Sequence, residues 1–225
     1  MIAEPDVSLT DYGLTLLAGG LAVALLRRGG PATPAQAWLV AFLAATALAT
    51  ALGGTVHGFF PDATGQAGRL LWVGTLLALG LAAWVAWGLG ASVLWAPGRA
   101  RRWVVGLAGL GLVAYGLGVA AGWRSFTLAV IHYLPAVLFL LAAFAVAYRR
   151  TRDPAALSGL VAVALILAGA VVQVRRIALH PVYFTHNALY HLMQAGALVA
   201  LSRTAGLHPS PARVAGRPPA EGPPC

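Results

Sequence analysis

Five of the six histidines lie close to one end of long apolar stretches, in the company of two aspartates. His57 closes one apolar stretch, and Asp62 follows it. His186 and His191 open the last stretch, and Asp11 lies near the start of the first. Imidazole is the side chain best suited to proton exchange or metal binding near neutral pH. Because bilayer segments normally exclude ionisable groups, these side chains are candidates for a functional site.

Two polar stripes end in these histidines. The spacing i, i+4, i+8, i+11 places four side chains on one helical face: Tyr183, Asn187, His191 and Gln194. A second face carries Thr46, Thr50 and His57. The stripes predict a polar, His-lined pocket that opens outward. In the alternative interpretation, each histidine bonds a backbone carbonyl and joins two helices.

The elements that would position these residues are seven apolar stretches, each near the length that crosses about 30 Å of hydrocarbon. They are approximately Ser8–Leu26, Ala35–Val56, Leu70–Leu94, Trp103–Trp123, Phe126–Tyr148, Ala155–Val174 and Val182–Leu201. The chain is 60% hydrophobic and 9% charged, with a mean hydropathy of +0.80. Since only helices and closed barrels satisfy the backbone in lipid, we expect an all-α, polytopic membrane protein with one bundle over residues 1–203. Residues 204–225 are rich in Pro and Gly, which predicts a disordered cytoplasmic tail.

The arginines predict the orientation. One side of the expected bundle carries eleven of them: Arg27, Arg28, Arg99, Arg101, Arg102, Arg149, Arg150, Arg152, Arg203, Arg213 and Arg217. The other side carries Arg69, Arg124, Arg175 and Arg176. The positive-inside bias therefore predicts an outer N-terminus and a cytoplasmic C-terminus, in a multi-pass protein of the inner (plasma) membrane.

Composition also excludes several classes of function. The chain has no lysine, so it cannot hold retinal or pyridoxal phosphate as a Schiff base. Its arginines are spread between apolar stretches and not gathered in one patch, so the lipid bilayer is the expected partner and nucleic acid is not. The single cysteine, Cys225, allows no disulfide within the chain.

The segment from His186 to His191 resembles the seventh-helix motif of the alkaline ceramidase and adiponectin-receptor superfamily. His57, which ends its own apolar stretch, is similar to the lone second-helix histidine of those proteins. The resemblance implies a seven-helix membrane hydrolase in which zinc is held by His57, His191 and His186. Zinc would activate a water that hydrolyses an amide or ester of a lipid. Asp11 or Asp62 would add the catalytic carboxylate.

In that interpretation, the lipid substrate would lie against the polar face of the last stretch. Asn187, Tyr183 and Gln194 are the candidate contacts there. Arg124, Arg175 and Arg176 would hold a phosphate or carboxylate of the lipid at the outer surface.

Two other functions remain open. The superfamily's serine position holds Gly53, its third-helix aspartate has no counterpart among Gly68, Arg69 and Trp72, and its first seventh-helix histidine is Asn187. These differences favour a binding or transport bundle without catalysis. The third alternative is a haem protein with His57 and His191 as axial ligands.

Overall fold

The computed structural model describes residues 2–61 and 65–207, and within them the chain forms seven α-helices and a short 3₁₀ helix. The helices are α1 (Pro5–Arg27), α2 (Pro34–Phe59), α3 (Gln66–Leu94), α4 (Arg99–Ala120), α5 (Phe126–Thr151), α6 (Pro154–Arg175) and α7 (His186–Ser202), followed by η1 (Arg203–Gly206). The helices α1 to α6 are long and apolar enough to cross a membrane, which indicates a membrane protein. This confirms the all-α prediction. Because α7 has only 17 residues, the seventh span stays a prediction. The orientation, which depends on the number of spans, stays a prediction too.

Local sequence signals explain where several helices begin. Thr33 and Gln36 form a capping box at the start of α2, where Pro34 occupies the first helical turn. Asp153 caps α6 by accepting a hydrogen bond from the backbone N–H of Ala155. In both cases the cap satisfies backbone donors that a helix leaves free at its N-terminus.

The predicted start of the last helix at Val182 is wrong, because α7 begins at His186. Pro181 cannot donate a helical hydrogen bond, and Nδ1 of His180 accepts from the backbone N–H groups of Val182 and Tyr183. These contacts hold residues 180–183 in a turn. Tyr183 is therefore outside the helix and does not belong to the polar stripe predicted for it.

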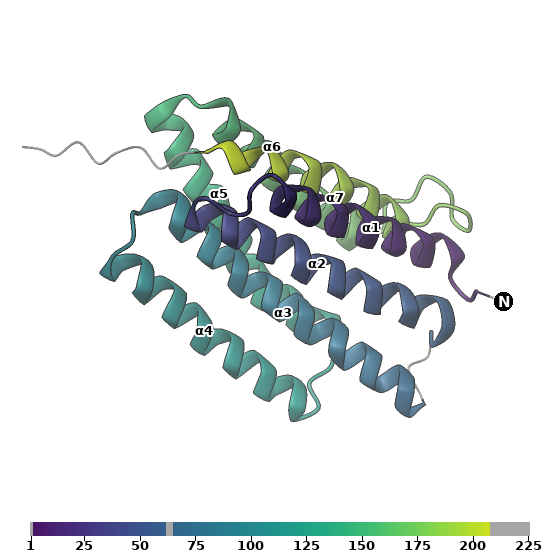
Figure 1. The fold of residues 1–225 in the computed structure, drawn as a ribbon. Coiled ribbons are helices and arrows are strands. Elements are labelled where there is room, and N and C mark those ends of the chain that lie inside the picture. Colours follow the sequence, from purple (N-terminus) through teal and green to yellow (C-terminus); the bar gives the residue numbers. More distant parts are fainter. Residues whose placement is uncertain (1, 62–64, 208–225) are drawn as a thin grey trace, which may run out of the picture.

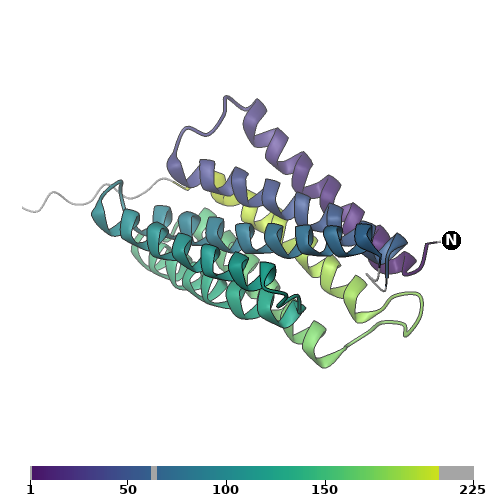
Figure 2. The same cartoon turned by 90° about the horizontal axis from the view of Figure 1, so that it is seen from below.

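Six helices form a closed ring in the order α1, α2, α3, α5, α6, α7, and α7 returns to α1. The remaining helix, α4, lies outside this ring against α3, as Figures 1 and 2 show. Glycine permits close helix contacts within the ring: a Cβ at Gly88 would overlap the ring of Trp38, and one at Gly159 would overlap the ring of Phe144. The first and last α-helices of the described chain are thus direct neighbours.

The bundle continues beyond residue 203, where the predicted tail was expected to begin. Leu207 and Thr204 are buried, and the side chain of Gln36 donates to the carbonyl of Ala205. Residues 208–225, which make up the rest of the predicted tail, lie outside the described residues.

Candidate functional site

Asp11 of α1 and His191 of α7 form a largely buried pair of ionisable side chains at the end of the bundle where α1 begins. Asp11 is only 4% exposed, and its Oδ1 lies 3.3 Å from Nε2 of His191 on α7. The other ring nitrogen of His191, Nδ1, lies 2.9 Å from Oγ1 of Thr10. Nδ1 is therefore within hydrogen-bonding distance of Thr10, and Nε2 is within ion-pair distance of Asp11.

The hydrogen bonds of Thr10 indicate where the protons lie. Its Oγ1 is 2.8 Å from the carbonyl of Asp6 and 3.0 Å from that of Val7, so the hydroxyl proton points back to its own helix. Thr10 then accepts from Nδ1–H of His191, which leaves Nε2 facing Oδ1 of Asp11, where one proton can bind between the two atoms. The pair is neutral overall in either form, as a carboxylic acid with imidazole or a carboxylate with imidazolium. Without that proton the pair would carry a net negative charge in a buried site, which is costly.

Glycines of α2 make room for Asp11. A Cβ at Gly54 would lie 2.9 Å from Cβ of Asp11 and 3.3 Å from the carbonyl oxygen of Ser8, while a Cβ at Gly53 would lie 3.4 Å from Oδ2 of Asp11. Ser8 also donates its hydroxyl proton to the carbonyl of Gly54 at 2.6 Å. Gly53, which stands where the superfamily has serine, thus faces the carboxylate and helps α1 approach α2.

Two further carboxylates lie nearer the end of the bundle. Oδ2 of Asp6 accepts from both the backbone N–H and the hydroxyl of Thr185, at 3.0 and 2.6 Å, which fixes the start of α7. Oε2 of Glu4 lies 2.8 Å from Nδ1 of His57, and these side chains are 42% and 31% exposed. Carboxylates and histidines therefore pair at two levels, one open to solvent and one buried.

Polar contacts continue on α7 beside His191. The ring of Tyr190 is tilted against that of His191 with centroids 5.5 Å apart, and Tyr190 accepts a hydrogen bond from Gln194 at 2.7 Å. The side chain of Gln173 donates to Oδ1 of Asn187 at 2.6 Å, which joins α6 to α7. Asn187 and Gln194 are thus bound within the bundle.

The other predicted site residues occupy less connected positions. His186 is the first residue of α7 and is partly buried, Tyr183 is 79% exposed, and Asp62 lies outside the described residues. The three arginines predicted to hold a lipid anion are exposed at this end of the bundle: Arg124 follows α4, Arg175 ends α6 and Arg176 caps it. Their side chains form no ion pair with a carboxylate of the described residues.

The described side chains do not form a zinc site. Among residues 2–61 and 65–207, no group of three His, Cys, Asp or Glu side chains is placed to hold a metal ion. Only Asp11 lies close to Nε2 of His191, at 3.3 Å, and two side chains are fewer than the three protein ligands of a catalytic zinc site. This donor set fits a hydrogen-bonded proton site better than a metal site.

Sequence reasoning missed Thr10, Asp6, Glu4 and Thr185. The spacing was nevertheless informative, because Asp6 and Thr10 are one helical turn apart and Asp11 follows directly. Acidic residues at the start of the first helix lie at the depth expected for the histidines of α2 and α7. What the pattern did not show is that α1 closes the ring against α7.

The fold and the site together define a helical membrane bundle with a buried carboxylate–histidine pair. Residues 7–206 match the model of a family of unknown function (DUF6962), and the chain belongs to that family. The matched region contains Asp11, His57 and His191. No curated protein and no solved structure matches the chain.

Proposed function

We propose that this protein is a proton-coupled transport bundle without hydrolytic activity, in which the Asp11–His191 pair binds the coupling proton. The observation that carries the proposal is the 3.3 Å contact between a carboxylate that is 4% exposed and an imidazole on the facing helix. Ionisable groups buried in membrane helices commonly mark proton relays and ion pathways. The pair offers two atoms between which one proton can move, Oδ1 of Asp11 and Nε2 of His191.

The exposed Glu4–His57 pair supplies the entrance for that proton. Glu4 is the N-cap of α1 and Asp11 lies seven residues later, so the two residues are roughly 10 Å apart along the helix axis. His57 is partly exposed and can exchange protons with water. With the N-terminus outside, as the arginine distribution predicts, the entrance faces the exterior of the plasma membrane.

Infrared difference spectroscopy of the protein in liposomes tests the proton site. A change of pH should produce the band of a protonated carboxyl group, and that band should be lost in Asp11→Asn. Asp153→Asn is the matched control, because Asp153 caps α6 far along the chain from the pair. A band that survives in Asp11→Asn, or one absent from the unsubstituted protein, would contradict the proposal.

Transport itself is tested in energised membrane vesicles that carry a pH gradient. A panel of organic cations, organic acids and sugars is added while a pH-sensitive dye reports the gradient. At least one class should dissipate the gradient with the unsubstituted protein and fail to do so with Asp11→Asn. If the whole panel acts identically on both proteins, the pair has no role in coupling to these solutes and the transport proposal is wrong for them.

A further inference from the structure

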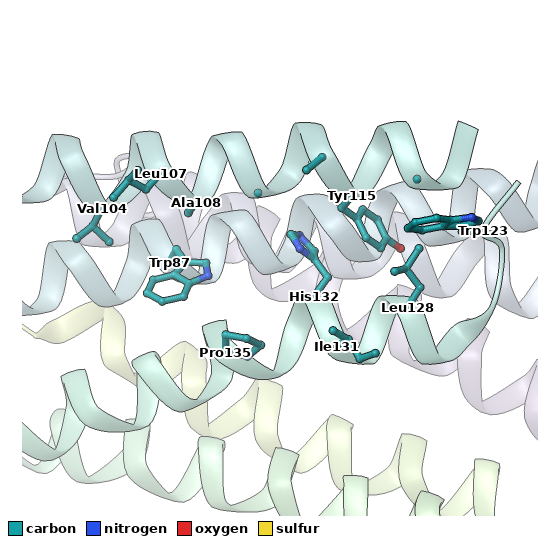
Figure 3. A pocket seen from close by; sticks show the side chains of 13 residues that line it. Trp87, Val104, Leu107, Ala108, Tyr115, Trp123, Leu128, Ile131, His132 and Pro135 are labelled. Atoms are coloured by element: carbon teal, nitrogen blue, oxygen red, sulfur yellow. The ribbon is translucent and has the colours of Figure 1, made fainter. Parts of the chain in front are cut away.

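A second feature lies on the far side of α3, between α4 and α5. A groove of about 600 Å³ runs there, as shown in Figure 3, and its volume is within the range of about 300–1,000 Å³ typical of small-molecule sites. It extends along α4 from Val104 to Gly118, which is roughly 21 Å of helix, and it ends at Trp123. The groove does not involve Asp11 or His191.

The groove exists because α4 is held away from α5. Ala108, Gly111 and Ala114 give α4 a wall of small side chains. The hydroxyl of Tyr115 donates to the carbonyl of Leu76 at 2.9 Å, which anchors α4 to α3. The imidazole of His132 on α5 stacks on the Tyr115 ring with centroids 4.5 Å apart (Figure 3). These contacts fix the spacing of the two helices without filling the space between them.

The groove is lined mainly by apolar side chains and opens toward the exterior of the ring, where a membrane protein meets hydrocarbon. Leaving it empty would forfeit van der Waals contacts along both walls. A hydrocarbon chain has the matching shape and polarity. The occupant should therefore be a lipid chain.

The charge at one end of α4 indicates the headgroup. Arg99, Arg102 and Trp103 line a separate hollow of about 410 Å³ together with Gly106. Both ion pairs in residues 2–61 and 65–207 involve histidine, so no carboxylate there neutralises these arginines. Arginine binds phosphate through paired hydrogen bonds, and tryptophan favours the membrane interface.

The hollow and the groove are lined by neighbouring residues of α4. Trp103 belongs to the hollow, and its neighbours Val104 and Leu107 line the groove. Leu107 is one helical turn beyond Trp103, so a headgroup at Arg99 and Arg102 lies within about two turns of the groove, near enough for an acyl chain of the same lipid to reach it. We propose that an anionic phospholipid binds along α4, with its phosphate on Arg99 and Arg102 and one acyl chain in the groove between α4 and α5.

Native mass spectrometry of the purified full chain tests this site with phosphatidylglycerol and phosphatidylcholine of identical acyl chains. We expect phosphatidylglycerol to bind about tenfold more tightly, and the double variant Arg99→Gln/Arg102→Gln to remove that preference. Arg27→Gln/Arg28→Gln is the matched control, since it removes the same charge at the end of α1. Equal binding of the two lipids, or an equal loss in both double variants, would overturn the assignment of the headgroup.

The groove is tested separately by filling it. Ala114→Leu places a larger side chain in the wall and should weaken binding of both lipids severalfold, while Ala120→Leu, on the same helix but outside the groove, should not. Circular dichroism and gel filtration verify that each variant is folded. If Ala114→Leu binds both lipids as the unsubstituted protein does, the acyl chain does not occupy the groove.

Discussion

Oδ1 of Asp11 and Nε2 of His191 face each other at 3.3 Å across the contact between α1 and α7, the first and last helices of the ring. Two other contacts cross the same boundary, from Thr10 to His191 and from Asp6 to Thr185. The polar residues that form the candidate site therefore also close the bundle. A structural role and a proton-binding role are separable by experiment, because they depend on different properties of Asp11.

Removing one partner of the buried pair should destabilise the fold. We expect Asp11→Leu to lower the free energy of unfolding by about 3 kcal/mol, because it leaves His191 buried and without its partner. Asp11→Leu/His191→Leu should recover part of this loss, since neither polar group then remains unpaired. Denaturant titration in detergent measures the free energy of unfolding of the unsubstituted protein and of the two variants. Glu4→Gln, at the exposed pair, should change stability by less than about 1 kcal/mol.

Close packing of α1 against α2 predicts a second stability effect. Gly54→Ala should cost about 1–3 kcal/mol, because the new Cβ would lie 2.9 Å from Cβ of Asp11 and 3.3 Å from the backbone oxygen of Ser8. Gly13→Ala is the control: nothing lies within 4 Å of its Cβ position, and alanine is the better helix former by about 0.5–1 kcal/mol. Thermal unfolding compares them. Equal effects of the two changes would mean that α1 and α2 are not this close.

The attachment of α4 gives a third prediction. Tyr115→Phe removes the hydrogen bond to the carbonyl of Leu76 but keeps the ring, so α4 should loosen by about 1 kcal/mol. Faster hydrogen exchange in residues 99–120, with little change in α1 and α7, is the expected signature. Tyr183→Phe serves as the control, because Tyr183 is exposed and its ring lies outside α7. Uniform acceleration across all helices would instead place Tyr115 in a bundle-wide contact.

Hydropathy predicted the helices well because length and apolar content alone determine which segments can lie in a membrane. Each of the seven apolar stretches corresponds to a helix. The start of α7 was missed since Val182 and Tyr183 are apolar enough to resemble helix, while Pro181 and His180 set a local turn that hydropathy does not register. The peripheral position of α4 was also invisible, because its outward face and its inward face are both apolar.

The sequence identified individual residues of the site but not how they pair. Asp11 and His191 were identified because ionisable groups are rare in membrane helices. Their partnership could not be predicted, since it depends on the rotation of α1 and α7 and on which helices close the ring. The sequence resemblance assigned His191 to zinc, whereas the structure surrounds both of its nitrogens with Thr10 and Asp11.

Metal analysis provides the fourth prediction. We expect the purified protein to contain no stoichiometric zinc and to take up none when zinc is added, because no third ligand lies beside Asp11 and His191 in the described residues. Elemental analysis of protein purified without chelators measures this directly. Stoichiometric zinc that disappears in His57→Ala and His191→Ala, but not in His132→Ala, would favour the lipid hydrolase. An intense visible absorption band would favour bis-histidine haem.

The last prediction concerns the topology on which the direction of proton entry depends. At 1.5 Å per residue the 17 residues of α7 span roughly 26 Å, slightly less than a hydrocarbon core of about 30 Å, but η1 extends the helix by a further turn. We therefore expect α7 to cross the membrane, which places the N-terminus outside and the C-terminus in the cytoplasm. Reporters that are active on only one side of the membrane, fused to each terminus, measure this.

Replacing Arg99, Arg101 and Arg102 by glutamine should reduce the fraction of molecules inserted in this orientation, whereas replacing Arg175 and Arg176 should not. If both termini report from the same side, α7 does not cross. In that case α7 would only cover the Asp11–His191 pair, and the pair would lie where the protein meets solvent.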